Sequence, residues 1–520
     1  MSDKMRVEQR SWTKTSIVRV FFVVMLIAMQ FAWIFEMITY LEARVTWLST
    51  AITFGAMVLT LTIFARHMNA SYRMFWMIVV MAFPMPGIVF YALMGRKNST
   101  RRMRREFETI DRSVFRKLKQ SRKTLETLEK EDQRAAGASN YLWKTCGFPV
   151  YRNTRVKFFA DAADGFEAQL QDLEKARHHI FMEYFAIEEE GAFERVFRIL
   201  KKKAEEGVEI RMIYDDIGSV AFLNRKFNRK MEEAGIHCIR FNPVLPLLNI
   251  FVNNRDHRKI MVIDGKVAYT GGYNLANEYF HITRPYGFWK DTGVRLEGAA
   301  VRSFSLIFLE MWDLLSHTDP AGDVKRYLPE IPCGIESDGY VQPYADSPLD
   351  DEPTGEEVYM NMLRTAKNYA YFVTPYLIIT DEMRREMVGA AKRGVDVRII
   401  TPGTPDKKLV YQETRSYYSG LVRGGVRIYE YTPGFCHAKM SVVDDRSATV
   451  GTINLDYRSL YLHFEDGVLF HRGRIVGEIK ADFEKMFRES EEVTNRYRKG
   501  AQTILKRSVR AVLRFLAPLL

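Results

Sequence analysis

The chain has 520 residues, of which 47% are hydrophobic, so it is long enough for two or three domains with substantial cores. Its formal net charge of +12 favours an anionic partner, and both nucleic acid and anionic lipid qualify. The four cysteines are scattered, without a CxxC pair or the ligand spacing of a zinc site, so neither a disulfide framework nor a zinc site is expected.

Three apolar segments fill most of residues 1–97, at about 17–40, 45–65 and 74–95. A helix of about 20 apolar residues spans the ~30 Å hydrocarbon core of a bilayer, so this region is predicted to form transmembrane helices that anchor the protein. A cleaved signal peptide fits poorly, because two further apolar segments follow the first one.

The distribution of basic residues predicts the orientation of this anchor. Basic groups precede the first segment, separate the second from the third, and follow the third, and the positive-inside bias places all of them in the cytoplasm. Three full crossings would put the two ends on opposite sides. Pro84 and Pro86 break the third segment, so we expect two crossings and a broken re-entrant or interfacial segment, with the globular part cytoplasmic. Three simple spans are the alternative.

Two charged regions flank the globular part. Residues 98–138 are rich in Lys, Arg and Glu and are predicted to form a solvated helical connector. Residues 491–520 are predicted to contain a basic amphipathic helix, which would lie on an anionic membrane surface or dock onto the globular part. Its apolar side carries Leu505, Val509, Val512, Leu513 and Leu516, and its basic side carries Lys506, Arg507, Arg510 and Arg514.

The region between these flanks contains an internal duplication. In each copy an apolar strand, an amphipathic helix that ends at Gly and a second β-rich strand precede a hairpin. These strands lie at 179–185 and 207–216 in the first copy, and at 369–376 and 394–403 in the second. Alternating strands and helices are typical of α/β proteins. We therefore predict an α/β fold with two pseudo-twofold-related domains, residues 139–332 and 333–490.

Each hairpin begins with the same motif, His, any residue, Lys, four residues, Asp. In both copies a strand, a tight turn and a second strand follow, and a Gly-containing loop then delivers an Asn. The motif residues are His257, Lys259 and Asp264, followed by Asn274, and His437, Lys439 and Asp444, followed by Asn454. Two ordinary hairpins with surface His and Lys would explain either copy alone, but not the duplicated set.

The residue types in this motif suit phosphodiester chemistry. Residues two apart on a strand share a face, so the His and Lys of each copy can point into one pocket. A neutral imidazole can attack phosphorus or accept a proton near pH 7, while Lys and an Asn amide hold the non-bridging oxygens. If one motif comes from each domain, a single site at their interface contains both His257 and His437.

The duplication also indicates a pair of carboxylates. Aligning residues 288–294 with 462–468 places Asp291 opposite Glu465. A carboxylate that accepts a hydrogen bond from the far ring nitrogen of a His fixes its tautomer and stabilises the imidazolium, and we predict this role for both. Asp264 and Asp444 lie in turns, with the wrong strand parity relative to their own His, so we expect them to brace the hairpins.

The paired motifs, with their Asn residues, resemble the phospholipase D superfamily. Within it, residues 84–96, 182–187 and 255–274 and the terminal LAPLL are similar to the bacterial cardiolipin synthase family, and the similarity covers nearly the whole chain. Asp256, Asn277, Ile453 and Asp466 depart from the usual pattern, which could change substrate preference but leaves the motif residues intact.

This resemblance implies two phospholipase D-like sandwich domains behind transmembrane helices, in a bacterial cell membrane. It also implies a two-step transfer without metal or cofactor. One His attacks the phosphorus of phosphatidylglycerol to form a phosphohistidine, and the other protonates glycerol and then activates a second phosphatidylglycerol, which yields cardiolipin. By analogy His257 is the nucleophile and His437 the acid and base, although the pseudo-symmetry permits the reverse.

The implied partners are phosphatidylglycerol, other anionic phospholipids and the membrane. Three alternatives stay open: a phospholipase D-type hydrolase with water as acceptor, a nucleic-acid phosphodiesterase, and a catalytically inactive membrane scaffold. The apolar segments and the scarcity of aromatic residues among the basic runs count against nucleic acid.

Overall fold

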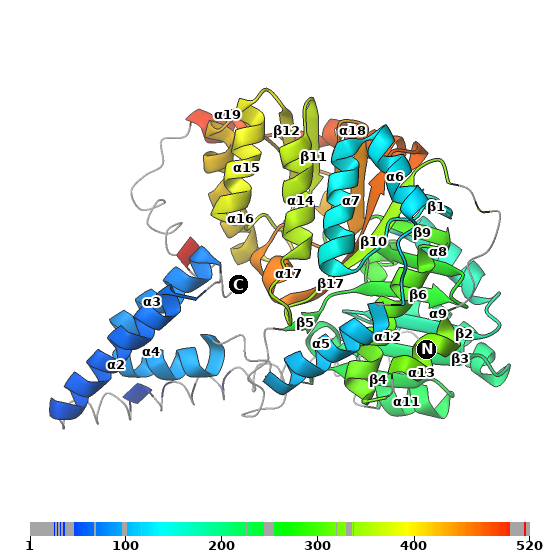
Figure 1. Ribbon diagram of the computed structural model, residues 1–520, viewed down its shortest axis with the longest axis horizontal. Helices are drawn as coiled ribbons and strands as arrows, with labels where there is room; N and C mark the ends of the chain where they lie inside the picture. Colours follow the sequence, from blue (N-terminus) through cyan, green and yellow to red (C-terminus); the bar gives the residue numbers. More distant parts are fainter. Residues whose placement is uncertain are drawn as a thin grey trace, which may run out of the picture.

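The computed structural model describes residues 46–66, 69–95, 101–115, 117–224, 226–243, 254–318, 320–328, 335 and 337–499, with the isolated positions 25, 29, 32, 35, 36, 514 and 515. Two α/β units form the body of the molecule, and the helices α2 to α4 extend from one side of it (Figure 1). The sheets in these units explain how the two motifs meet.

The first unit is built on a seven-stranded mixed sheet. In spatial order its strands are β1 (Thr154–Phe159), β9 (Gly293–Gly298), β7 (Val267–Gly271), β6 (Lys259–Ile263), β2 (His179–Tyr184), β3 (Glu209–Asp215) and β4 (His237–Phe241). Strands β2, β3 and β4 are parallel, and the helices α9 (Ala192–Glu205) and α11 (Phe227–Glu233) make the crossovers that parallel pairing requires. The motif hairpin is β6–β7.

The second unit repeats this order. Its strands are β10 (Tyr340–Asp346), β17 (His463–His471), β16 (Ser447–Gly451), β15 (Met440–Val443), β11 (Tyr369–Val373), β12 (Asp396–Pro402), β13 (Arg427–Tyr431) and the additional β18 (Ser490–Glu492). Position by position, the first seven match the order of the first sheet, and the motif hairpin is β15–β16. The predicted α/β fold with two related domains is confirmed.

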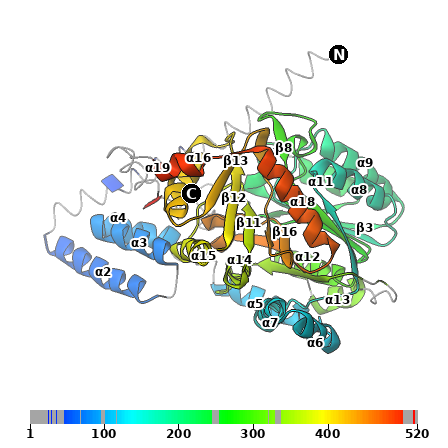
Figure 2. The same cartoon turned by 90° about the horizontal axis from the view of Figure 1, so that it is seen from above.

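Helices cover the sheets and join the two units. They are α8 (Ala162–Leu173), α12 (Val301–Ser316), α14 (Thr354–Thr365), α15 (Asp381–Lys392), α16 (Lys408–Arg423) and α18 (Arg474–Arg488), with the shorter α10 (Asp216–Ser219), α13 (Pro320–Tyr327) and α19 (Thr494–Lys499). Helix α18 lies across the second sheet (Figure 2). It also touches β1, while α12 packs on the first sheet and touches β10. One hydrophobic cluster therefore contains residues of both units, such as Phe181 and Phe372.

The predicted connector is helical, but it is not solvated on every side, because part of it is buried against the first unit. It forms α5 (Arg101–Phe115), α6 (Arg122–Glu131) and the first part of α7 (Gln133–Cys146), and α5 packs against α12. Four apolar side chains of α5 are buried there, namely Phe107, Ile110, Val114 and Phe115. Their spacing places them on one helical face, which the high overall charge of the segment conceals.

The N-terminal arm differs from the predicted set of membrane spans. The apolar segment 17–40 lies outside the described residues apart from isolated positions, and the second forms α2 (Thr46–Phe64). The third is divided, because α3 (Ala70–Ala82) ends at Phe83 before Pro84, and α4 (Pro84–Phe90) and the π-helical η1 (Tyr91–Gly95) follow.

The predicted break at Pro84 is therefore present, and it leaves α3 about 20 Å and α4 about 10 Å long, against ~30 Å of hydrocarbon. In the part of the chain that the structure describes, no helix combines the length and the apolar character needed to cross a membrane. The prediction of a multi-pass anchor of transmembrane helices is not supported there.

Most of the predicted C-terminal amphipathic helix also lies outside the described residues. At two positions the tail contacts the protein itself: the Arg514 guanidinium donates to the Ser416 carbonyl at 2.6 Å, and the ring centroids of Phe515 and Phe75 are 5.0 Å apart. Ser416 belongs to α16 and Phe75 to α3, so these two residues link the arm to the second unit.

Candidate active site

Two short parallel strand pairs join the units and place the histidine of each motif next to residues of the other unit. Strand β5 (Arg255–Asp256) of the first unit pairs with β17 of the second, and β8 (Phe288–Lys290) of the first pairs with β14 (Gly434–Cys436) of the second. The His257 N–H, just after β5, donates to the Phe464 carbonyl at 2.9 Å. The His437 N–H, just after β14, donates to the Lys290 carbonyl at 2.8 Å. Each motif histidine therefore hydrogen-bonds to the residue just before a carboxylate of the other unit, since Phe464 precedes Glu465 and Lys290 precedes Asp291.

The carboxylates pair with the histidines across the units. Nδ1 of His257 lies 2.9 Å from both carboxylate oxygens of Glu465, and Nδ1 of His437 lies 2.7 Å from Oδ2 of Asp291. Both carboxylates are fully buried. A carboxylate at Nδ1 holds the ring proton there and leaves the Nε2 lone pair available for reaction. The structure thus assembles one composite site from both halves.

The two lysines lie buried beside their own histidines. Lys259 Nζ donates to the His257 carbonyl at 2.6 Å. Lys439 Nζ donates to the His437 carbonyl and lies 2.7 Å from Nδ1 and 3.1 Å from Nε2 of that ring. Burial lowers the pKa of Lys259 to about 8 and that of Lys439 to about 7. Both ammonium groups therefore lose protons closer to neutral pH than an exposed lysine does.

The same environment keeps the imidazoles neutral. Burial and the adjacent Lys439 lower the pKa of His437 to about 4, and burial with Lys259 lowers the pKa of His257 well below its usual value. Burial raises the pKa of Glu465, which Lys259 and the Thr452 hydroxyl oppose. A neutral imidazole near pH 7 is the form that can attack phosphorus or accept a proton.

The two motif asparagines are buried and held by hydroxyl groups five residues further on. Asn274 donates to the Tyr279 hydroxyl at 2.9 Å, in the 3-10 helix η2 (Asn277–Phe280), and Asn454 donates to Ser459 Oγ at 3.1 Å, in α17 (Tyr457–Tyr461). The Tyr279 ring lies 5.3 Å from the His437 ring, so Asn274 of the first unit is anchored beside the histidine of the second.

The motif aspartates contact backbone rather than the histidines of their motifs. Asp264 accepts hydrogen bonds from the backbone N–H groups of residues 177, 178 and 179 at 2.7–2.9 Å, and Asp444 does the same for residues 367, 368 and 369. Both have left-handed backbone conformations, with φ of 52° and 53°. Each carboxylate therefore ties its hairpin turn to the start of the neighbouring strand, β2 or β11.

Substituting these aspartates is expected to affect stability. Asp264→Ala or Asp444→Ala leaves three backbone donors without their acceptor, so each should lower the free energy of unfolding by about 1–3 kcal/mol, with Asn in place of Ala less costly. Urea unfolding of the purified variants measures this, and the exposed Asp164→Ala on α8 serves as the control, expected within about 0.5 kcal/mol of the unmodified protein. Unchanged stability in both Ala variants would contradict the bracing role.

Sequence reasoning missed Thr452 and gave Asp466 no structural role, although both shape the site. The Thr452 hydroxyl donates to Glu465 at 2.5 Å, and Asp466 accepts from the Lys259 backbone N–H at 3.2 Å. At the position equivalent to Thr452 stands Gly272, where an added Cβ would lie 2.1 Å from the Asp291 carboxylate. The available signal was the alignment of the two copies, in which Thr452 and Gly272 both stand two residues before the motif Asn.

One group of side chains in the described residues has the spacing of metal ligands, but its hydrogen bonds do not suit a metal ion. The ligand atoms of His257, His463 and Glu465 lie within 4.8 Å of one another. However, Arg458 Nε donates to the His463 Nε2 at 3.2 Å, which leaves the proton on Nδ1, the nitrogen that faces Glu465. His257 likewise directs its Nδ1 at Glu465. The nitrogens of both rings that face Glu465 therefore carry protons and have no lone pair to bind a metal ion there.

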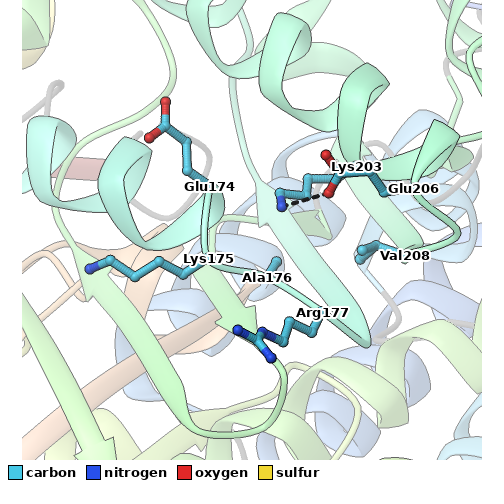
Figure 3. Close-up of a pocket in the computed structure, with 7 residues that line it drawn as sticks. All are labelled: Glu174, Lys175, Ala176, Arg177, Lys203, Glu206 and Val208. Atoms are coloured by element: carbon cyan, nitrogen blue, oxygen red, sulfur yellow. Dashed lines mark hydrogen bonds and ion pairs between the residues drawn. The ribbon is translucent and has the colours of Figure 1, made fainter.

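A hollow in the described surface lies away from the motif histidines. It has a volume of about 570 Å³ and sits where α8 ends, β2 begins and α9 ends (Figure 3). Its lining residues are Glu174, Lys175, Ala176, Arg177, Lys203, Glu206 and Val208. None of these is a predicted site residue, and Lys203 is paired with Glu206 at 2.8 Å. The histidine cluster is instead deeply enclosed, with each motif His only 7% exposed.

A duplicated α/β unit, with one His-Lys motif from each copy at a shared site, defines the phospholipase D-like class of proteins. The family described as "Cardiolipin synthase, PLD-like domain" matches residues 170–299 and 359–487, one match in each unit. The crystal structure of a phosphatidylserine synthase from Haemophilus influenzae has the same fold, with a TM-score of 0.56 at 15% identity, over 75% of this chain and 100% of that one.

Two relatives with higher sequence identity show to which family within this class the chain belongs. A cardiolipin synthase of Halalkalibacterium halodurans is 32% identical over 441 residues, which cover 84% of this chain and 86% of that protein. A protein of Streptococcus mutans named only as uncharacterized is 40% identical over 445 residues, 86% of this chain and 96% of that one. The chain belongs to the cardiolipin synthase family of phospholipase D-like proteins.

Proposed function

We propose that this protein is a phosphatidyltransferase that converts two molecules of phosphatidylglycerol into cardiolipin and glycerol. The observation that carries the proposal is the crossed pairing of His257 with Glu465 and of His437 with Asp291, which places two imidazoles in one enclosed site, each with its Nδ1 facing a carboxylate. Relatives about 32% identical over most of the chain carry the name cardiolipin synthase, which supports this choice of reaction.

In the first step the Nε2 of His257 attacks the phosphorus of the donor lipid. A P–N bond forms, the P–O bond to glycerol breaks, and the departing oxygen takes a proton from His437, whose protonated form the bound phosphate favours. In the second step His437 accepts the proton of an acceptor hydroxyl, whose oxygen attacks phosphorus as the P–N bond breaks. We assign His257 as the nucleophile, and the reverse assignment is the alternative that the experiments below separate.

The surrounding groups hold the reacting phosphate and the imidazoles. We propose that Lys259, Lys439, Asn274 and Asn454 bind the non-bridging oxygens, since ammonium and amide N–H groups stabilise the charge that develops there. Asp291 and Glu465 stabilise the imidazolium forms. The 7% exposure of each motif histidine supports a lipid hydroxyl as acceptor, because an enclosed site limits the access of water.

We further propose that the arm formed by α2 and α3 associates with the bacterial membrane, with the active site on the cytoplasmic side. The support is a set of large apolar side chains on its surface, exposed by 46% to 73%: Trp47, Phe54, Met57, Val58, Leu61, Phe64, Met74, Ile78 and Met81. An exposed apolar surface of this kind favours contact with lipid, and the basic residues beside the apolar segments favour the cytoplasmic side.

The proposed reaction is tested with full-length protein in vesicles of phosphatidylglycerol, without added metal or nucleotide. Cardiolipin and glycerol should appear in equal amounts, and acid-labile, base-stable phosphohistidine should be trapped by rapid quenching. Phosphatidic acid and glycerol without cardiolipin would identify a hydrolase, and cleavage of added DNA in preference to lipid would identify a nucleic-acid phosphodiesterase. The absence of both products and phosphohistidine would indicate a scaffold.

The pH dependence follows from the buried lysines and histidines. Binding of the anionic phosphate needs charged ammonium groups, which are lost as pH rises through the pKa of about 7 at Lys439 and about 8 at Lys259. As pH falls, the nucleophile His257 becomes protonated and its carboxylate Glu465 loses its charge; burial lowers the pKa of His257 and raises that of Glu465. We therefore expect kcat/KM, measured in vesicles, to form a bell between these limits. Lys439→Arg should move the alkaline limb toward about 8, and a rate that still rises at pH 9 would contradict this account.

A further inference from the structure

The two carboxylates of the site have different surroundings, although the units are related by pseudo-symmetry. Asp291 lies against His437 and accepts the backbone N–H of Thr292 at 2.8 Å. Glu465 lies against His257, accepts the Thr452 hydroxyl, and has a second imidazole, that of His463, with Nδ1 at 3.4 Å from its Oε1. The aligned position in the first unit holds Trp289, not a histidine.

The proton of His463 is placed by Arg458. Because a guanidinium only donates, the Arg458 Nε–H at 3.2 Å requires a lone pair on the His463 Nε2, and the neutral ring therefore carries its proton on Nδ1. His463 is 9% exposed; its Nδ1 forms no hydrogen bond to the described residues and lies 3.4 Å from the Glu465 Oε1. The ring centroids of His463 and His257 are 5.5 Å apart. The Nδ1–H thus has one acceptor within reach, the carboxylate that also orients His257.

We propose that His463, held by Arg458, is a positioning residue that keeps Glu465 ionised so that Glu465 can orient His257. An N–H group only 3.4 Å from a buried carboxylate oxygen favours the charged form of that carboxylate. If Glu465 were protonated, it would donate to Nδ1 of His257 and move the ring proton to Nε2, the atom assigned to attack phosphorus. The inference rests on the proposed function, because its readout is the formation of phosphohistidine at His257.

Other charges face these groups and enter the pH dependence. Around Glu465 they are Lys259 and Asp456, and around His463 they are Arg458, Arg255, Lys259 and Lys407. Burial and these four cations lower the pKa of His463, so the ring beside Glu465 stays neutral and carries its one N–H on Nδ1. The negative charge of Asp456 disfavours the ionised form of Glu465. A donor near this carboxylate offsets that effect.

The test compares phosphohistidine formation with overall turnover in phosphatidylglycerol vesicles across pH. Removing the donor, as in His463→Phe, should slow phosphohistidine formation about tenfold at pH 7 and move its acid limb to higher pH by about one unit, with KM and the second step nearly unchanged. The sign follows because Glu465 must be ionised, and losing a donor raises the pH at which it ionises. His463→Asn, which keeps an N–H donor, should restore the profile.

Two further variants make the result specific. Trp289→Phe alters the pseudo-symmetric position and should leave the acid limb where it is. Arg458→Met releases the tautomer without changing the ring of His463, and should shift the limb in the same direction even if His463→Phe fails to fold. Equal slowing of both steps with an unshifted profile, or no change, would overturn the positioning role. If the unmodified protein forms no phosphohistidine, the proposed function fails first, which is a separate outcome.

Discussion

Replacing either His257 or His437 by Ala is expected to reduce cardiolipin formation by at least about 10⁴-fold, because groups that act as a unit each cost nearly the whole rate enhancement when removed. His257 supplies the nucleophile in our assignment, and His437 the proton transfers of both steps. The measurement is cardiolipin formed per mole of folded protein in phosphatidylglycerol vesicles. The double variant should be no slower than the slower single variant, since one missing partner already stops the reaction.

A matched control separates chemistry from general damage. His317→Asn changes a largely exposed histidine that pairs with Glu106 at the end of α12, and Asn tolerates the left-handed backbone at this position, where φ is 54°. Its activity should equal that of the unmodified protein. Retention of more than about 1% activity in His257→Ala or His437→Ala would contradict covalent catalysis by this pair.

Neutralising Asp291 and Glu465 one at a time should show that each carboxylate assists the histidine of the other unit. Asp291→Asn and Glu465→Gln keep the shape of each side chain but remove the charge that stabilises an imidazolium, and each is expected to lower kcat by about 10²- to 10⁴-fold. Because the pairing is crossed, Asp291→Asn acts on His437 although it lies in the first unit, and Glu465→Gln acts on His257 although it lies in the second.

A lipid donor with a nitrophenyl leaving group distinguishes the two effects, since this group departs without a proton. With that donor, Asp291→Asn should form phosphohistidine at nearly the normal rate and accumulate it, because the base for the second step is impaired. Glu465→Gln should form it slowly. The opposite pattern would assign the nucleophile to His437, and equal slowing in both variants would contradict a division of roles.

The duplication explains why so much of the fold could be predicted from the sequence. The two copies share apolar strands, helices that end at Gly and the motif hairpins, and strand periodicity is a local property that each segment carries in its own residues. Strands β2 and β3 and their counterparts β11 and β12 lie where the pattern places them. Helix α5 shows the limit, because its buried face depends on α12, which lies almost 200 residues further along the chain.

The candidate site shows the same division between local and tertiary information. His257, Lys259 and Asn274, with their counterparts, could be identified from spacing, and the aligned copies indicated Asp291 and Glu465. Spacing could not show which carboxylate contacts which histidine, because that depends on the ladders β5–β17 and β8–β14 between units. The roles of Thr452 and His463 beside Glu465 could not be predicted either, because neither residue belongs to a recognisable sequence motif.

The sequence by itself determined the chemistry of this protein: two His-Lys motifs with their asparagines, and two copies of an α/β unit to carry them. These follow from residue identity and from strand and helix periods, which are encoded within short segments. Only the tertiary structure decided that each histidine pairs with a carboxylate of the other unit, that α5 buries an apolar face against α12, and that one half alone has a further imidazole beside its carboxylate. Such contacts join residues distant in the chain, and their geometry is set by packing between the sheets.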